Sequence, residues 1–261
     1  GRTTKVKLTK HGFIDSGRVR LDRKVEEKTS PKELYGGFQF RAPVWQAGRV
    51  LYTKAADDLV GTFAILTLAK KLKGSANFIG VLTRAEEIGF IGCICHFELG
   101  WLKKARRRIV CVSLETSRTL PGADVGKGPI VRLGDRATCF DPNAVEILHS
   151  IARKTMAGKF QRRIMDGGTC EATVATAYGY SAIGMSIPLG NYHNQSFQGG
   201  PDSRGKDGPA PEFVHLDDLI GMLALGEKLC RSGLPWGKPW ERKIQDFKSW
   251  KKAARKLIAL H

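Results

Sequence analysis

The stretch Asn77-Phe-Ile-Gly-Val-Leu-Thr-Arg-Ala-Glu-Glu-Ile-Gly-Phe-Ile-Gly92 joins an apolar run to two adjacent carboxylates, Glu86 and Glu87, and a glycine-spaced turn. Residues 78–83 are typical of a strand, and residues 88–102 of a helix after the turn. A buried strand has no structural use for two neighbouring charges, because each costs several kcal/mol to desolvate unpaired. The pair suits a metal site, where one carboxylate binds the cation and the other deprotonates water. It equally suits a solvated strand end that opens a helix.

The residues on both sides of this stretch predict alternating helices and strands. Residues 59–72 and 143–156 have helical spacing of apolar residues, the second with Asp141 and Pro142 as its start signal. Residues 108–114 are typical of a fully buried strand. The remaining predicted strands are residues 130–133, 162–165 and 182–188. A helix that ends at residue 177 and another at residues 216–230 are the remaining predicted helices. The alternation predicts a three-layer α/β fold, with a mostly parallel mixed sheet flanked by helices.

The chain divides into three parts by composition. Residues 1–50 form a β-rich segment, residues 51–232 the α/β domain, and residues 233–261 a basic, tryptophan-containing extension. From Trp240 onward, apolar residues recur every three or four positions, which predicts an amphipathic helix with a basic opposite face. The later members of this stripe are Ile244, Phe247, Trp250, Ala254, Leu257 and Ile258. Such a helix docks on its own domain or a sister subunit, binds RNA, or lies on an anionic membrane surface.

Charge is unevenly distributed along the chain. The 261 residues have a formal net charge of +18, and 42% of them are hydrophobic, which suffices for a core. Residues 1–35 hold ten Lys and Arg against five Asp and Glu, and residues 226–261 hold ten against three. Basic ends favour a polyanionic neighbour, RNA being the first candidate, although solubility explains them equally well.

Other features indicate an intracellular protein. No apolar stretch reaches the length of a membrane span, and the N-terminus is basic without the apolar core of a signal peptide. The six cysteines have no C-x-x-C spacing and fall mostly in apolar segments, so we expect free, buried thiols in a reducing compartment. The cytoplasm is the expected location, with the mitochondrial matrix as the alternative.

Carboxylates and one imidazole stand at predicted strand ends or in the loops that follow them. They are Asp57, Asp58, Glu86, Glu87, Glu115 and His193. Ligands bind beyond the carboxyl ends of strands in open α/β sheets. Oxygen and nitrogen ligands without thiolate suit zinc, cobalt or manganese. Alone, Asp57 could cap a helix and His193 could be an ordinary loop residue. Their joint placement predicts a site for one or two divalent metals.

Five segments follow one another in order within residues 37–230. They are Lys54-Ala-Ala-Asp-Asp-Leu-Val-Gly61, Leu82-Thr-Arg-Ala-Glu-Glu-Ile-Gly-Phe-Ile-Gly92, Gly126-Lys-Gly-Pro129, Gly167-Gly-Thr169 and Ser186-Ile-Pro-Leu-Gly-Asn-Tyr-His193. Together they resemble the co-catalytic, two-metal metallo-aminopeptidases, and most closely the tetrahedral and glutamyl aminopeptidase family, which is also described as endoglucanase-like. The Asp-Asp-x-x-Gly and Thr-Arg-Ala-Glu-Glu-x-Gly-Phe-x-Gly motifs are specific when they occur together at this separation.

The resemblance implies a role for each candidate. Asp57 would bridge two metals, and Glu86 would be the general base that takes a proton from the attacking water. Glu87 would bind one metal and His193 the other. Glu115 falls where the family places a carboxylate ligand, usually aspartate.

The resemblance also implies a pocket and partners. Thr169 and Gly168 would line the pocket for the amino terminus of a peptide substrate, and Asp58 would support Asp57. The expected cofactor is one or two divalent ions per chain, zinc or cobalt before manganese. The family also implies a homo-oligomer.

The chain departs from the family pattern in three places. Leu59 and residues 189–190 stand where the family has arginines. The Gly-His-x-Asp segment that supplies a further histidine ligand is missing. The most similar segment of the chain is residues 12–17, with Phe13 in place of the imidazole and His11 two residues away. Residues 1–50 would instead match the small β domain that the family inserts before Asp57.

Two functions therefore compete. The first is a metal-dependent aminopeptidase-type hydrolase with Glu86 as the general base. The second is a catalytically impaired, aminopeptidase-like scaffold that associates with RNA or a ribonucleoprotein particle through its basic termini. The carboxylates favour the first, and the missing histidine and the basic ends favour the second.

Overall fold

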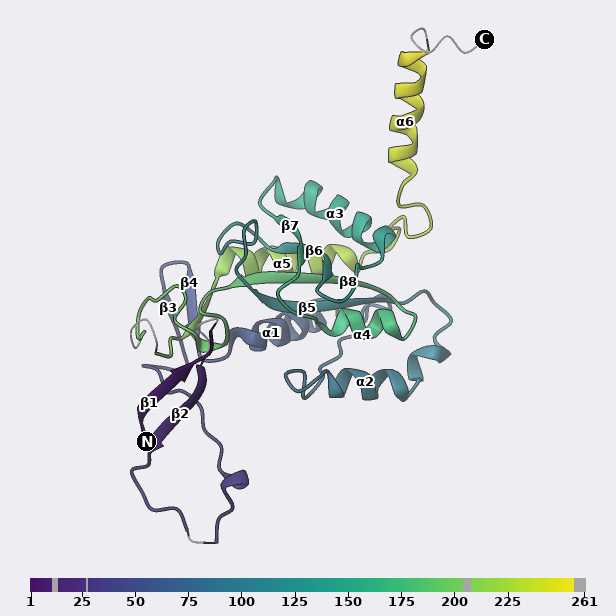
Figure 1. The fold of residues 1–261 in the computed structure, drawn as a ribbon. Coiled ribbons are helices and arrows are strands. Elements are labelled where there is room, and N and C mark those ends of the chain that lie inside the picture. Colours follow the sequence, from purple (N-terminus) through teal and green to yellow (C-terminus); the bar gives the residue numbers. More distant parts are fainter. Residues whose placement is uncertain (11–13, 27, 204–207, 256–261) are drawn as a thin grey trace.

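A computed structural model of the chain describes residues 1–10, 14–26, 28–203 and 208–255 (Figure 1). The fold is α/β, as predicted, with helices on both sides of a mixed sheet. Its elements are β1 (Arg2–Leu8), β2 (Ile14–Arg20), η1 (Pro31–Glu33), β3 (Val44–Ala47), β4 (Val50–Thr53), α1 (Ala56–Lys71), α2 (Ile91–Glu98), η2 (Trp101–Lys104), β5 (Val110–Arg118), β6 (Ile130–Asp135), α3 (Pro142–Met156), β7 (Gln161–Met165), α4 (Glu171–Ala177), β8 (Ser181–Leu189), η3 (Tyr192–Asn194), β9 (Glu212–His215), α5 (Leu216–Leu229) and α6 (Glu241–Ala254).

The central sheet has the strand order β5-β8-β6-β7. β5 runs parallel to β8 and β6 parallel to β7, whereas β6 and β8 are antiparallel. β8 is the centre of the core: Ile183, Met185, Ile187 and Leu189 are almost completely buried. Because β5 and β8 point the same way, the residues that follow them reach one edge of the sheet.

The helices form where the sequence predicts strong start signals and apolar faces. The Asp141 side chain caps α3 by accepting hydrogen bonds from the backbone N–H groups of Asn143 and Ala144. α1 packs against β5 and α5, and α5 also packs against α3. α2 packs against α4, which covers β8 and β5. These contacts enclose one main apolar cluster around β8.

A second, antiparallel sheet connects the N-terminal segment to the α/β domain. Its order is β3-β4-β9. The expected boundary at residue 50 lies in the β3–β4 hairpin, and β4 pairs with β9, so this sheet contains residues from both sides of the boundary. The β1–β2 hairpin forms a separate two-stranded sheet that projects from the body with mostly exposed side chains (Figure 1).

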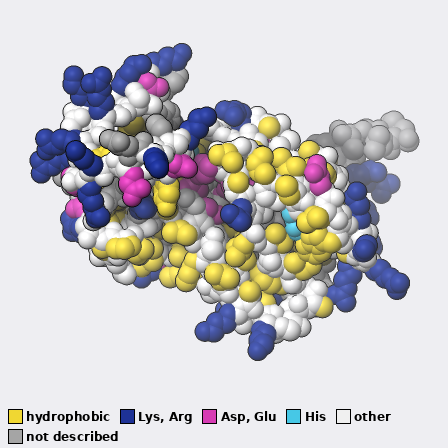
Figure 2. Space-filling model, turned by 90° about the horizontal axis from the view of Figure 1, so that it is seen from below, with side chains coloured by type: hydrophobic (Ala, Val, Ile, Leu, Met, Phe, Trp, Pro, Cys, Tyr) yellow, Lys and Arg dark blue, Asp and Glu magenta, His cyan; other side chains and the backbone are white. Residues whose placement is uncertain are grey.

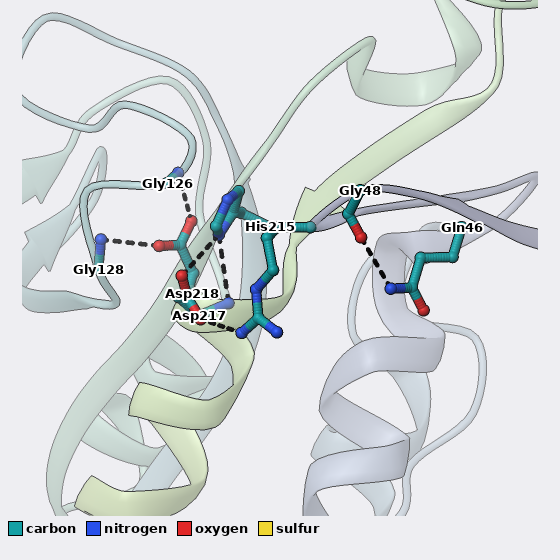
Figure 3. Close-up of polar contacts among 8 residues, drawn as sticks. Gln46, Gly48, Gly126, Gly128, His215, Asp217 and Asp218 are labelled. Atoms are coloured by element: carbon teal, nitrogen blue, oxygen red, sulfur yellow. Dashed lines mark hydrogen bonds and ion pairs between the residues drawn. The ribbon is translucent and has the colours of Figure 1, made fainter.

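The start of α5 is fastened to the loop before β6 (Figure 3). Asp218, fully buried, accepts hydrogen bonds from the backbone N–H groups of Gly126 and Gly128, each at 2.7 Å. Gly128 has φ +94°, and a Cβ there would lie 2.0 Å from the carbonyl oxygen of Lys159, so only glycine fits. His215 caps the helix by accepting from the Asp217 N–H group at 3.2 Å. These hydrogen bonds fix the end of β9, whose first residue, Glu212, lines the cavity of the candidate site.

Three sequence expectations around residues 78–118 are wrong. Residues 78–83 form no strand, because no neighbouring strand pairs with them in the described chain, and Ile79 and Leu82 stay exposed. The helix predicted at residues 88–102 is only α2, since Phe90 and Gly100 adopt left-handed conformations at its two ends. The strand predicted as fully buried is the edge strand β5, on which Val112 is exposed.

The C-terminal extension contains the predicted amphipathic helix as α6. No residue of α6 is buried, and the helix stands clear of the α/β domain (Figure 1), so it does not dock along that domain. A hydrogen bond of 2.8 Å from Trp240 Nε1 to Asn143 Oδ1 holds its start. Leu257 and Ile258, the last residues of the predicted stripe, lie outside the described residues.

Two further expectations concern membranes and thiols. Within the described residues, no helix is both long and apolar enough to cross a membrane. All six cysteines are free, as predicted, but Cys95 and Cys139 are exposed and only Cys93 and Cys170 are fully buried, so the expected burial is wrong for most of them.

Candidate active site

The Asp-Asp-x-x-Gly motif turns two neighbouring carboxylates in different directions at the start of α1. The backbone is non-helical at both aspartates, and Asp57 lines a cavity. Asp58 instead accepts a hydrogen bond of 2.8 Å from the Gly61 N–H group. A Cβ on Gly61 would lie 2.1 Å from Asp58 Oδ2 and 2.7 Å from the carbonyl oxygen of Leu114, so the motif requires glycine here. Asp57 is thereby left free to face the site.

A tight turn presents Glu86 and Glu87. The Gly89 and Phe90 N–H groups both donate to the Glu86 carbonyl oxygen, at 3.0 and 2.9 Å. Gly92 donates to the carbonyl oxygen of Arg84, against which a Cβ would sit at 2.4 Å, so the last motif glycine permits this close approach. The backbone hydrogen bonds hold both carboxylates at the edge of the sheet without using their side-chain oxygens.

Three of the predicted ligands converge. The ligand atoms of Asp57, Glu87 and His193 all lie within 4.8 Å of one another. His193 Nε2 is 3.5 Å from Asp57 Oδ2 and 3.9 Å from Glu87 Oε2. The His193 ring stacks on Tyr192, with centroids 3.8 Å apart, in the loop after β8. These residues come from α1, the loop before α2 and the loop after β8, and they border a cavity of about 440 Å³.

The site concentrates negative charge in a partly dehydrated place. Burial, followed by the nearby charges of Glu87 and Asp57, raises the pKa of Glu86 to about 7. Burial and Glu115 raise the pKa of Asp58 to about 9. The carboxylate of Asp57 also raises the pKa of His193, because its negative charge stabilises the protonated imidazole. A positive charge among the carboxylates would lower the pKa of each of these groups, although the part of the rise that burial causes in Glu86 and Asp58 would remain.

The donor atoms fit a divalent metal ion. Asp57, Glu87 and His193 offer two carboxylates and one imidazole within the span of a single ion's ligands. Oxygen and nitrogen donors without thiolate are typical of hydrolytic zinc, cobalt and manganese sites. The arrangement can therefore bind a cation with Glu86 beside it as a proton acceptor.

The other predicted residues lie differently. Glu115 accepts a hydrogen bond from Ser113 Oγ, and burial raises its pKa to about 8, with Glu86 and Asp57 adding to the rise. It is near the three converging residues but is not one of them. Thr169 and Gly168 lie in the loop before α4 and do not line the cavity beside Asp57. His11 and Phe13, which replace the missing histidine segment, lie outside the described residues.

Glu212 is a site residue that the sequence motifs do not predict. This residue is 3% exposed, lines the same cavity, and accepts a hydrogen bond of 3.1 Å from the Asp57 N–H group. Burial raises its pKa to about 7. The signal was available, because Glu212 is a charged residue beside the apolar pair Phe213 and Val214. Only the pairing of β9 with β4 brings it to Asp57.

Comparisons with known proteins agree with the resemblance predicted from the motifs. The family model for M42 glutamyl aminopeptidases matches residues 9–198. No curated protein matches the chain.

Several solved structures have a similar fold. A TET aminopeptidase from the marine sediment archaeon Thaumarchaeota archaeon SCGC AB-539-E09 is 21% identical, with 73% of this chain and 51% of that chain covered and a TM-score of 0.58. Aminopeptidase APDkam598 from the archaeon Desulfurococcus kamchatkensis is 23% identical, covering 74% and 52%, with a TM-score of 0.57. The TET1 peptidase of Pyrococcus horikoshii is 20% identical, covering 70% and 50%, with a TM-score of 0.54. The chain spans about half the length of these structures.

Proposed function

The chain belongs to the M42 glutamyl aminopeptidase family, and we propose that it is a metal-dependent aminopeptidase that removes residues from the amino termini of peptides. The observation that carries the proposal is the convergence of Asp57, Glu87 and His193 within 4.8 Å, beside Glu86. The family match and the fold of the TET aminopeptidases support the same reaction class.

Asp57, Glu87 and His193 would hold the metal, with Glu115 as an additional ligand on its buried side. Zinc or cobalt is the first choice and manganese the second, with one or two ions per chain. A bound divalent ion supplies Lewis-acid polarisation of the scissile carbonyl and makes water more acidic.

Glu86 is the proposed general base. Burial raises the pKa of Glu86, so its carboxylate accepts a proton from the attacking water more readily than an ordinary glutamate does at neutral pH. The same carboxyl group then donates that proton to the leaving amine. The partly buried position of Glu86 favours both transfers, because the neutral and the charged form are close in free energy.

The chain's other residues position the base and the substrate. Glu212 holds the backbone at Asp57 and so fixes where that carboxylate points. The acidic cavity attracts the positively charged amino terminus of a peptide. Thr169 and Gly168 remain proposed contacts for this terminus, and Asp58 supports Asp57 from the buried side.

We also propose that the chain works as a homo-oligomer. The Pyrococcus horikoshii TET1 peptidase can assemble into a tetrahedron or a large octahedral shell. For this chain, assembly is testable by light scattering of the purified protein.

The decisive experiment measures metal content and aminopeptidase activity together. Purified protein should contain one or two divalent ions per chain by elemental mass spectrometry and should hydrolyse aminoacyl p-nitroanilides. Glu86→Gln should lower kcat by about 10²- to 10⁴-fold while the metal content stays unchanged. Metal binding without activity would contradict the proposal, and so would activity that is indifferent to Glu86.

A second candidate is the impaired scaffold. The observation that favours it is that only three ligand atoms from the described residues converge, which is fewer than a two-metal site requires. Protein without metal or activity, even after zinc or cobalt is added, would support the scaffold.

A further inference from the structure

The start of β5 carries a dense run of cations. Residues 103, 104, 106, 107 and 108 are Lys or Arg, and residues 99–110 contain no acidic residue. All five side chains are exposed. Since Val110 of β5 pairs in parallel with Ser181 of β8, this run lies at the edge where both strands begin. The candidate active site lies beyond the ends of the same strands, about 30 Å away at the rise of a nine-residue strand.

The cationic run borders a hollow. A cavity of about 370 Å³ is lined by Lys103, Arg107, Arg108, Tyr180 and Ser181, among others. Arg107 Nη1 donates to the Ala76 carbonyl oxygen at 3.3 Å, and Arg108 Nη1 to that of Trp236 at 2.8 Å. These bonds fix the two guanidinium groups without neutralising them. Among the described residues, no carboxylate lies within 4.0 Å of any cation in the run.

The C-terminal extension continues the positive charge. Residues 231–255 hold eight Lys and Arg against two acidic residues. The Arg108–Trp236 hydrogen bond joins this extension to the cationic run, and the Trp240–Asn143 bond holds the base of α6. In Figure 1, α6 and the end of α2 lie on the same side of the molecule, away from the N-terminus. Figure 2, which shows the molecule from below, has a group of acidic side chains left of the centre, and Lys and Arg toward the left and right ends.

Aromatic rings are interleaved with these cations. Trp240, Phe247 and Trp250 are 39, 50 and 59% exposed. Lys243 Nζ lies 5.5 Å from the Phe247 ring centroid and 5.2 Å from that of Trp250. Exposed rings stack on unpaired bases, and neighbouring cations contact phosphates.

We propose that the residue 103–108 run, its cavity and the extension through α6 form a binding track for single-stranded nucleic acid. The cavity accepts backbone phosphate between Lys103, Arg107 and Arg108, and α6 offers cations and stacking rings. An anionic membrane fits less well, because nearly half of the track's net charge lies in the residue 103–108 run, outside any amphipathic helix. The track uses no residue of the candidate active site.

The test measures binding of the full chain to a fluorescein-labelled 20-nucleotide oligouridine, and to oligothymidine of the same length, by fluorescence anisotropy. The triple variant Lys103→Glu/Lys104→Glu/Arg106→Glu should weaken binding at least tenfold at 0.15 M salt. It should also reduce the slope of the logarithm of the binding constant against the logarithm of the salt concentration by about 2. The matched control is Lys5→Glu/Arg18→Glu/Arg20→Glu on the exposed β1–β2 hairpin, which changes the net charge equally and should cost less than about threefold.

A second pair of variants tests stacking. Phe247→Ser/Trp250→Ser should weaken binding about tenfold or more, whereas Tyr35→Ser, at a fully exposed ring elsewhere, should not. Circular dichroism confirms that each variant is folded.

Three outcomes would overturn the proposal. The first is equal loss in the hairpin control, which would mean that only net charge matters. The second is no binding to either oligonucleotide. The third is co-sedimentation with vesicles of phosphatidylcholine and phosphatidylglycerol that depends on Phe247 and Trp250 and outcompetes both oligonucleotides.

Discussion

The two ends of β5 and β8 in the central sheet lie beside groups of opposite charge: one end is the basic edge and the other the acidic edge of the sheet. β5 begins just after the residue 103–108 run and carries Glu115 near its far end; β8 begins beside the basic cavity and leads to His193. The carboxylates gather at one edge and the cations at the other. Net charge therefore says little about the site, since a chain of +18 contains an acidic cavity. Charges this far apart are screened from one another in salt, so the basic residues at one edge have little effect on the carboxylates at the other.

Carboxylates at the acidic edge fall into two groups. Asp218 receives two backbone N–H groups and fastens a loop. Asp57 and Glu87 lie instead beside His193 at the cavity, where their oxygens can reach a bound ion. Asp218 is thus buried and held by backbone donors, whereas the proposed metal ligands Asp57 and Glu87 are more exposed and lie beside the cavity.

Removing a proposed ligand should have the largest effect. Asp57→Ala should lower metal affinity by more than about 100-fold, because it removes a charged ligand and leaves Glu87 and His193 without its support. Equilibrium dialysis with zinc measures the change. The Lys103→Glu/Lys104→Glu/Arg106→Glu variant should bind metal like the unmodified protein. If it loses metal equally, the two edges are not independent.

Glu212 offers a sharper test of positioning. Glu212→Ala should reduce kcat and metal affinity by about 10- to 100-fold, since nothing then holds the Asp57 backbone. Glu212→Gln keeps an acceptor oxygen and should retain most of both. Equal losses in the two variants would mean that the charge of Glu212, rather than its hydrogen bond, matters.

Asp218 should affect stability more than metal binding. Asp218→Ala leaves the N–H groups of Gly126 and Gly128 without their acceptor and should cost about 2 kcal/mol of unfolding free energy. Urea unfolding measures this loss. Zinc affinity should change less than it does in Asp57→Ala; the reverse order would place Asp218 in the site.

The metal-free protein should also lose stability as the pH rises. Burial holds the pKa of Glu115 at about 8 and that of Asp58 at about 9, above the values near 4 of unfolded chains. The folded state therefore binds more protons at these two groups between these limits, so their contribution to stability is fully present below about pH 4 and is lost as the pH rises toward 9. We therefore expect the free energy of unfolding to decrease between pH 5.5 and 8.5.

Thermal unfolding in the presence of a chelator, at a series of pH values, measures the slope of stability against pH. Glu115→Gln, which does not titrate, should reduce it. Stability that rises over this range would show that these carboxyls are already ionised in the folded state.

The sequence by itself determined the fold class, the family and the order of most helices and strands. Apolar spacing indicates α1, α3, α5 and β8, because the regularly spaced apolar residues of each element form the face that it buries. The glycines of the two acidic motifs mark tight backbone approaches, at Gly61 and Gly92, that no other residue permits. These are local constraints, and they can be read from neighbouring residues.

Only the tertiary structure decided which residues meet. Residues 78–83 have a strand-like pattern, but a strand needs a hydrogen-bonding neighbour, and no described residue supplies one. Glu212 reaches Asp57 across 155 residues because β9 pairs with β4. The residue 103–108 run joins the C-terminal extension through Trp236. Such meetings depend on strand pairing and chain crossing, which spacing along the sequence does not encode.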